Sequence, residues 1–221
     1  VWPVLALAGV LGRHGRGVFE TAAMLGSQNG ATPESTVTEV GILAEISRAT
    51  GRPVSFGLTQ TLAGEGLHRQ VLELVAEANA GGAQVHPQTT VRSVGVLFGL
   101  AHHTPYGGCP AWQALNGLDL DQRLAHVRDP ENRAQLIAEA DGREGGIDPS
   151  LLFPLDTVPA DYSLRPETSL AARAEAAGST PAALWLDLLD ATDGGCLLVW
   201  PFLNQTPAEV EHLLGDPNVV L

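Results

Sequence analysis

Residues 37–60 read VTEVGILAEISRATGRPVSFGLTQ and residues 68–90 read HRQVLELVAEANAGGAQVHPQTT, and each stretch predicts a helix, a turn and a buried strand. Apolar or small residues recur at i, i+3, i+4 and i+7 in both, which is the spacing of one helix face. Glycine ends each predicted helix, Gly51 in the first and Gly81 in the second, and a short apolar run follows. Two such units in tandem predict parallel strands with covering helices.

Polar residues end these predicted strands. In parallel α/β folds the chemistry lies at the C-terminal ends of the strands, which directs attention to Gln60, His86 and Gln88. His86 is a candidate metal ligand or general base, because neutral imidazole suits both roles. Gln60 and Gln88 can orient a substrate amide or carboxylate through their donor and acceptor atoms. The alternative for all three is a hydrogen-bonded residue at the end of a strand.

Two further candidates lie outside the tandem units. Glu20 is the only carboxylate that ends a predicted strand, and it is a candidate base or metal-bridging ligand. Asn204 ends the apolar run 196–202 and is a candidate substrate-binding residue. A solvated position is the alternative for Glu20. By contrast, the paired histidines at 102 and 103 are not expected to bind one metal ion, because neighbouring side chains diverge. We expect them to lie in a polar loop.

The remaining histidines and the tryptophans have simpler interpretations. Four histidines fall on predicted helices or helix ends, and we expect them at the surface; they are His14, His68, His126 and His212. The four Trp residues are expected to pack in the core or in a lid, because no basic stripe accompanies them.

Composition excludes several classes of protein. The 221 residues are 44% hydrophobic, which indicates a globular protein, and they carry a net charge of −13 with twelve Arg and no Lys. This acidity argues against nucleic acids and anionic membranes as partners. The absence of lysine excludes Schiff-base chemistry, a P-loop lysine and a carboxylated metal-bridging lysine within this chain. No apolar run approaches the roughly 18 residues of a membrane span.

The ends of the chain and its cysteines bear on its origin. Val1 lies within an amphipathic segment and residues 219–221 read as the start of a buried strand, so we expect an internal fragment of a longer protein. No basic leader is visible, and we expect a cytoplasmic protein.

Cys109 and Cys196 form no CxxC pair; two reduced thiols are expected, with a disulfide between them as the alternative.

Other segments complete the predicted organisation. Residues 102–168 are too long for an ordinary connection, and we expect an excursion that acts as a lid over the C-terminal face of the strands. Within it, 119–141 is helical, with a helix start at 129–131, and 142–168 is a Pro- and Gly-rich loop. Thr180 is the expected N-cap of a later helix at 181–189. The remaining predicted elements are helices at 3–12, 169–177, 181–189 and 207–214, strands at 18–21 and 196–202, an apolar strand or helix at 91–101, and a Gly-, Ser- and Asn-rich loop at 25–33.

The order of these segments resembles a known family. The segments are GRGVFET (15–21), LAEISRATGRPVSFGL (43–58), ANAGGAQVHPQ (78–88), RLAHVRDPENRAQLIAE (123–139), LLVWPFLNQ (197–205) and VEHLLGDPNVVL (210–221). Together they resemble the amidohydrolase superfamily, in its N-acyl-D-amino-acid deacylase-like branch (amidohydrolase family 3). The resemblance implies an α/β fold, a partial (β/α)8 TIM-type barrel, with residues 1–221 as one incomplete barrel segment. It also implies that the family's His-x-His motif lies before this chain and its Gly-Ala-His motif after it.

The chain departs from the family at two strand ends. Where the family has a His-x-Arg-x-Glu motif, residues 22–24 read Ala-Ala-Met. The position of the family's metal-binding histidine on the next strand is occupied by Leu58. The family's Tyr-Pro-Tyr word after the following strand is also absent.

We therefore expect a parent protein that is a zinc-dependent hydrolase of C–N bonds, acting on a small N-acyl amide. The main zinc ligands would lie outside this chain, with His86 as its own contribution, and the chain alone would be inactive. The alternative is a catalytically degenerate barrel that acts as a binding or scaffold protein, which Leu58 and Ala22 favour. A nucleotide-binding doubly wound sheet is disfavoured, because no glycine fingerprint opens a helix. The sequence does not predict an oligomeric state.

Overall fold

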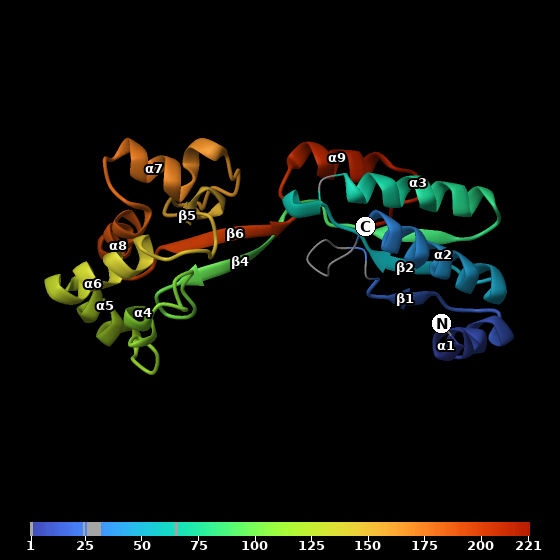
Figure 1. Ribbon diagram of the computed structural model, residues 1–221, viewed down its shortest axis with the longest axis horizontal. Coiled ribbons are helices and arrows are strands. Elements are labelled where there is room, and N and C mark those ends of the chain that lie inside the picture. The colour runs from blue at the N-terminus through green and yellow to red at the C-terminus, as the bar shows by residue number, and fades with distance from the viewer. Residues whose placement is uncertain (1, 24, 26–31, 65) are drawn as a thin grey trace. The chain divides into compact units, whose positions relative to one another are not determined.

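A three-stranded parallel sheet organises the first part of the chain (Figure 1). The computed structural model describes residues 2–23, 25, 32–64 and 66–221. The strands are β1 (Phe19–Thr21), β2 (Val54–Gly57) and β3 (Val85–Gln88), in the order β1-β2-β3, and both pairs are parallel. The helices of this part are α1 (Trp2–His14), α2 (Pro33–Thr50), the short 3-10 helix η2 (Leu62–Gly64), α3 (Leu67–Ala80) and α9 (Pro207–Gly215). The two predicted helix–turn–strand units are confirmed. Met24 and residues 26–31 of the predicted loop lie outside the described residues.

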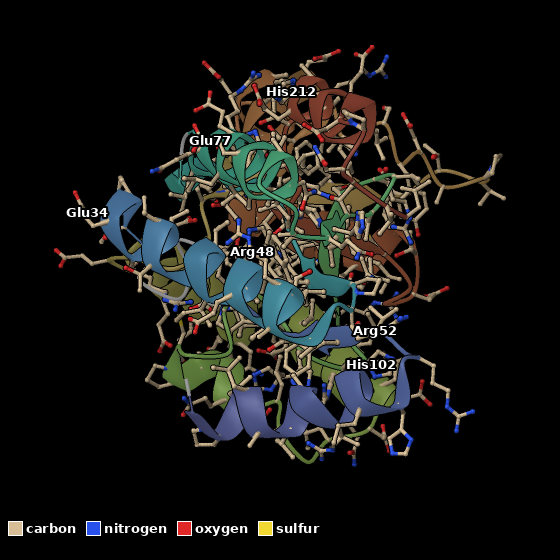
Figure 2. The ribbon with its side chains drawn as sticks, turned by 90° about the vertical axis from the view of Figure 1, so that its right-hand side faces the viewer. Glu34, Arg48, Arg52, Glu77, His102 and His212 are labelled. Carbon is tan, nitrogen blue, oxygen red and sulfur yellow. The ribbon has the colours of Figure 1, made fainter. Side chains whose placement is uncertain are left out.

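Local sequence signals fix the ends of α2. Thr32 accepts a hydrogen bond from the Ser35 amide at 3.2 Å, and Ser35 Oγ accepts one from the Thr32 amide at 2.8 Å, which completes a capping box. At the other end Gly51 adopts φ 62° and donates its N–H to the Ser47 carbonyl, as expected for a glycine stop. Arg48, labelled in Figure 2, donates to the carbonyls of Ala78 and Gly81 at the end of α3. The guanidinium thus joins the two helices that precede β2 and β3.

The strand positions alternate between two environments. Val54 and Phe56 of β2 and Val85 of β3 are fully buried and belong to one hydrophobic core with residues of α2 and α3. The helical members of that core include Val40, Leu43, Ala44, Ile46, Val71, Leu72 and Val75. The intervening strand positions therefore lie on the opposite face of the sheet, away from this core.

The chain divides into two compact units, Val1–Val94 with Phe202–Leu221, and Gly95–Pro201. The second unit contains most of a sheet in the order β4-β6-β5, in which β5 and β6 pair antiparallel. Its elements are β4 (Val94–Gly99), α4 (Pro110–Gln113), α5 (Leu120–Arg128), α6 (Pro130–Asp141), η3 (Pro149–Leu151), β5 (Phe153–Leu155), η4 (Pro166–Thr168), α7 (Leu170–Ala176), α8 (Pro181–Ala191) and β6 (Leu197–Leu203). The protein is therefore a mixed α/β protein with one parallel sheet, and no closed barrel is formed by the residues described.

One prediction for this second unit needs correction and another is confirmed. The segment 142–168 is not only a loop, because residues 153–155 form β5 and pair with β6. This pairing is non-local, whereas the Pro- and Gly-rich sequence of the segment favoured a loop. The predicted helix start at 129–131 is confirmed, because Asp129 ends α5 and caps α6 by accepting from the amides of Glu131 and Asn132.

Aromatic rings fill the core of the second unit. Trp112 and Trp185 are buried and stack with a centroid distance of 5.5 Å and an interplanar angle of 8°, and Tyr106 lies 4.9 Å from Trp112. The prediction that Trp residues pack in the core is confirmed for these two. Cys109 and Cys196 are both buried and free, so the expected two thiols are present and the alternative, a disulfide between them, is not.

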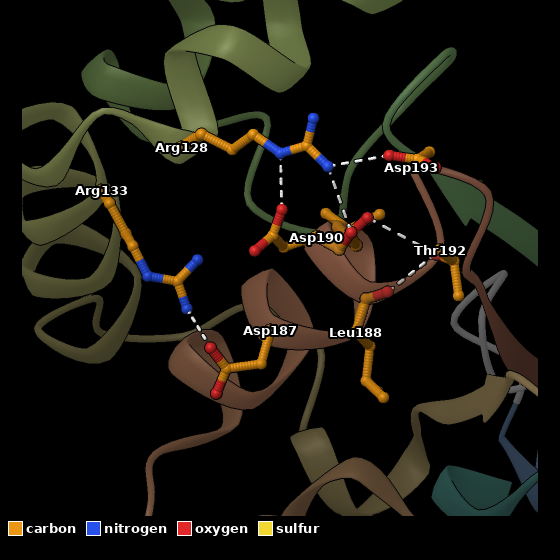
Figure 3. Close-up of polar contacts among 8 residues, drawn as sticks. Arg128, Arg133, Asp187, Leu188, Asp190, Thr192 and Asp193 are labelled. Atoms are coloured by element: carbon orange, nitrogen blue, oxygen red, sulfur yellow. Dashed lines mark hydrogen bonds and ion pairs between the residues drawn. The ribbon is translucent and has the colours of Figure 1, made fainter.

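Exposed ion pairs connect α5 and α6 to α8 and the turn that follows it (Figure 3). Arg128 contacts Asp190 at 2.5 Å and Asp193 at 2.8 Å, and Arg133 pairs with Asp187. Such solvent-exposed pairs each contribute at most about 1 kcal/mol to stability, so the aromatic core holds this unit together.

Across the described residues, no helix combines the length and apolar character needed to cross a membrane.

We predict that Thr180→Ala lowers the free energy of unfolding by about 1 kcal/mol, because Thr180 Oγ1 accepts the Ala183 amide at 3.2 Å and caps α8. Urea unfolding followed by circular dichroism measures the change. Thr180→Ser retains the capping oxygen and is the control. Equal losses in both variants would show that the hydroxyl does not cap the helix.

Candidate functional site

Two predicted site residues, Glu20 and His86, form one row across the parallel sheet with Ser55, which lies between them. The strand register pairs Glu20 with Ser55 and Ser55 with His86. This row lies on the face opposite the helix-packed core, because side chains alternate along each strand. Ser55 is buried, and its Oγ donates to the His86 carbonyl at 3.0 Å. The structure therefore brings the two predicted catalytic residues, Glu20 and His86, onto the same sheet face.

The two candidates are separated by a whole strand. Glu20 is exposed and His86 is half-buried. With neighbouring strands about 4.8 Å apart, the backbones of Glu20 and His86 are roughly 10 Å apart. The His86 Nδ1 lies 3.4 Å from the Asn218 carbonyl oxygen, a contact that favours the proton on Nδ1 and leaves Nε2 as an acceptor. A substrate group lying over Ser55 could reach both side chains.

Space is available beside His86 on this face. Gln88 lies two positions after His86 and is paired in register with Gly57. A methyl group added at Gly57 would meet no described atom within 4 Å. The half-buried Gln88 side chain is thus on the same face as His86, next to a strand position that leaves room for a ligand.

Gln60 and Asn204 lie together, and most of their polar atoms form hydrogen bonds within the protein. The Asn204 Oδ1 accepts the Gln60 amide at 2.9 Å, and the Asn204 amide donates to the Gln60 carbonyl at 2.7 Å. The Asn204 Nδ2 donates to Thr89 Oγ1 at 3.2 Å and to Thr90 Oγ1 at 3.0 Å. The Gln60 Oε1 accepts the Thr206 amide at 3.0 Å. Both side chains are buried, and these contacts give them a structural role.

A complete zinc centre does not fit the described residues. Leu58, at the position that the family resemblance assigns to a metal histidine, is only 1% exposed and belongs to the hydrophobic core. The search of the described ranges finds no group of three or more His, Cys, Asp or Glu side chains that could hold a metal ion. His86 therefore belongs to no such group within those ranges.

His68 corrects a sequence prediction, because it is buried and not at the surface. It occupies the second position of α3, and its side chain is 3% exposed. The His68 Nε2 lies 2.7 Å from Glu209 Oε2, and Arg69 donates to both oxygens of Glu209 at 2.9 Å. These three side chains line a pocket of about 470 Å³ together with Gln60, Gly66 and Thr206. His14 and His212 are exposed as expected, and His126 is half-buried.

Contacts and burial in this pocket lower the pKa values of Glu209 and His68. Hydrogen bonds from Arg69 and His68 lower the pKa of Glu209 to about 2, so the carboxylate is ionised near neutral pH. Burial lowers the pKa of His68 below its ordinary value, although Glu209 acts in the opposite direction. A neutral imidazole whose Nε2 faces an ionised carboxylate carries its proton on Nε2. The Nδ1 is then an acceptor.

A sequence signal for His68 existed. His68 lies in the first turn of α3, the helix that follows β2, and residues at such positions collect at the C-terminal edge of a parallel sheet. Glu209 begins a helix after β6, which belongs to the other sheet, so its place beside His68 depends on tertiary structure. The prediction of a surface position for His68 rested only on its place at a predicted helix or helix end.

No family model, curated protein or solved structure matches this chain. Functional inference therefore rests on the residues and their geometry.

We predict that the free energy of unfolding falls as the pH drops below 6.5, the ordinary pKa of histidine, because unfolded His68 takes up a proton more readily than folded His68. Glu209 contributes in the same direction between its ordinary pKa of 4.5 and about 2. Denaturant unfolding from pH 8 to pH 5 measures the His68 contribution. In His68→Gln, which cannot titrate, the decline should be shallower; parallel curves for the two proteins would contradict the assignment.

We also predict that Asn204→Gly costs about 2 kcal/mol and Asn204→Ala about 3 kcal/mol of unfolding free energy. Both lose the buried hydrogen bonds, and alanine adds strain at φ 52° where glycine does not. Urea unfolding measures both losses. Wild-type stability in Asn204→Ala would instead return Asn204 to the role of a substrate ligand.

Proposed function

We propose that this chain is part of an amidohydrolase of the N-acyl-D-amino-acid deacylase-like type, which hydrolyses the C–N bond of an N-acyl amide. The observation that carries the proposal is the row of Glu20, Ser55 and His86 on the sheet face away from the helices, beside the open position at Gly57. In a (β/α)8 barrel the helices form the outer ring, so this face corresponds to the barrel interior. Gln88 adds an amide at the C-terminal edge of the same face.

His86 is the residue that we assign to proton transfer. Its Nδ1 contact with the Asn218 carbonyl orients the ring and leaves Nε2 to accept a proton from the attacking water. Water oxygen then adds to the acyl carbon, the C–N bond breaks, and the proton passes to the leaving nitrogen, which gives a carboxylic acid and an amine. Glu20 and Gln88 contact the substrate on either side of that position.

The zinc of the parent enzyme is part of the proposal, with its main ligands contributed from outside this chain. Bound zinc supplies a Lewis acid and an activated water in hydrolases of this kind. Because we assign the His86 Nε2 to proton transfer, that nitrogen is not also a zinc ligand, and the described residues contain no group of three or more side chains that could hold a metal ion.

A second candidate is a binding or scaffold protein built on the same sheet. Two observations favour it: Leu58 fills the core where the resemblance expects a metal ligand, and Gln60 and Asn204 are bonded within the protein. In that case the face over Ser55 would bind a small molecule without converting it.

We predict that the full-length parent hydrolyses N-acetyl-amino acids and that this chain alone does not. In the parent, His86→Asn should lower kcat/KM by at least about 100-fold, because a positioned proton-transfer group contributes roughly 10²–10⁴. His126→Gln, on α5 in the other unit, is the matched control and should retain activity. An amine-release assay measures the rates.

A second pair of variants tests the open face. Gly57→Ala should be tolerated, whereas Gly57→Leu should fill the space beside Gln88 and raise KM without loss of stability. An inactive parent that still binds N-acetyl-amino acids would favour the binding protein. Full activity in His86→Asn would remove His86 from the mechanism.

A further inference from the structure

Another pocket lies within the second unit of the chain, and the proposed hydrolysis does not use it. It is lined by the turn before α4, the end of α6, the loop after α6 and the first residue of α8. Its charged and hydroxyl-bearing lining residues are Tyr106, Asp141 and Arg143, and we call it the Tyr106 pocket. The volume of about 250 Å³ is just below the range of roughly 300–1,000 Å³ that drug-sized ligands occupy, so the occupant is a small molecule.

The Arg143 guanidinium is held in place with most of its donors unused. Its Nη1 donates to the Pro105 carbonyl at 3.1 Å. Two glycines lie against it: a methyl group added at Gly108 would come within 3.4 Å of Nη2, and one at Gly146 within 3.1 Å of Cζ. A guanidinium has five N–H donors, and in the part of the chain that the structure describes only Pro105 accepts from this one. The remaining donors are available to an anionic group.

The Tyr106 hydroxyl adds a polar group without a partner to the same pocket. The residue is only 7% exposed, and its ring lies 4.9 Å from that of Trp112. Its Oη makes no hydrogen bond to any described residue, yet it is not one of the atoms that are both enclosed and unpartnered. Oη therefore keeps an accessible surface, at a residue that lines the pocket. Burial and the nearby Asp141 carboxylate raise the pKa of Tyr106, so the hydroxyl stays protonated and can donate.

The end of α6 supplies the opposite charge. Asp141 is the last residue of this helix, and the helix dipole adds partial negative charge at the same place. No basic residue lies in the last turn of α6 to offset it. Among the described residues, neither Asp141 nor Arg143 takes part in an ion pair, with each other or with a third side chain. The pocket thus presents one positive and one negative group that are not paired.

This pair of charges narrows the choice of ligand. A simple anion would be repelled by Asp141, and a simple cation would be repelled by Arg143. A neutral molecule would leave both charges without a partner, whereas a zwitterion satisfies both. A metal ion is disfavoured, because the described residues contain no group of three or more side chains that could hold one. Much of the remaining lining is apolar and includes Ala140, Ile147 and Pro181.

We infer that the Tyr106 pocket binds a free α-amino acid with a small apolar side chain. Its carboxylate accepts from the Arg143 guanidinium and the Tyr106 hydroxyl, and its ammonium group contacts Asp141. Its side chain packs on Ala140 and Ile147. The inference does not rest on the proposed function, although an amino acid is also what hydrolysis of an N-acyl amino acid releases. An N-acyl amino acid has no ammonium group, so the pocket distinguishes the free amino acid from such a substrate.

Three related probes test the inference on the wild-type protein at pH 7. Alanine, tested as each enantiomer, has both charges; N-acetylalanine lacks the cation, and alaninamide lacks the anion. Titration followed by ¹⁵N chemical shifts of the Gly145 and Gly146 amides and of Arg143 Nε should show saturable binding of alanine. N-acetylalanine and alaninamide should each bind at least about tenfold more weakly than the preferred enantiomer, the usual worth of one charge-assisted hydrogen bond.

Matched variants isolate the three polar groups. Tyr106→Phe keeps the ring against Trp112 and removes only the hydroxyl, so alanine should bind about tenfold more weakly. Arg143→Gln should abolish saturable binding, and Asp141→Asn should remove the preference for alanine over N-acetylalanine. Glu144→Gln changes the net charge by the same amount as Asp141→Asn at an exposed residue that does not line the pocket, and it should bind alanine as the wild type does.

Several results would overturn the inference. They are absence of saturable alanine binding, binding of N-acetylalanine or alaninamide as tight as that of alanine, and unchanged alanine affinity in Tyr106→Phe. Equal effects of Glu144→Gln and Asp141→Asn would show a general effect of charge and would overturn it as well. The comparison of probes on the wild-type protein decides the matter even where a variant fails to fold. None of these results depends on hydrolytic activity, so the proposed function can fail separately.

Discussion

The hydrogen bonds of Asn204 are the interaction on which the first unit depends. This residue, at φ 52°, turns the chain after β6 and joins it to Gln60 after β2 and to Thr89 and Thr90 after β3. The bonds link segments 115 and 144 positions apart in sequence. Because α9 begins three residues later, they also bring Glu209 to His68 and create the pocket. Asparagine suits the position, since it tolerates left-handed backbone and carries both a donor and an acceptor.

Local features were predictable from sequence and distant pairings were not. The stop at Gly51, the cap at Thr180 and the helix start after Asp129 depend on neighbouring residues alone, and all three are confirmed. Strand β5 was missed because its stability comes from pairing with β6. Gln60 and Asn204 were correctly placed at strand ends, but their mutual bonds depend on tertiary structure. His68 was misassigned for the same reason, because its partner Glu209 is 141 residues away.

The polar residues at the strand ends divide into two groups with different roles. Gln60 and Asn204 are hydrogen-bonded to each other and to neighbouring segments, and they hold the edge of the sheet in place. Glu20, His86 and Gln88 lie on the face away from the helices, where the proposed hydrolysis would take place. Leu58 belongs to neither group, since its side chain is part of the core. Under the proposed function, a chain with this division would supply the scaffold and part of the reacting face, and the proposed zinc would be bound mainly by residues from outside it.

Hydrogen exchange at the Gln60 amide tests the central claim most directly, because this N–H donates to the Asn204 side chain and lies outside the strands. If Asn204 fixes the end of β2, this amide should exchange as slowly as that of Phe56 within β2, through the same global opening. Exchange at the rate of an exposed loop, with Phe56 still protected, would show that the strand ends open independently. It would contradict the account of how the candidate site and the His68 pocket are held.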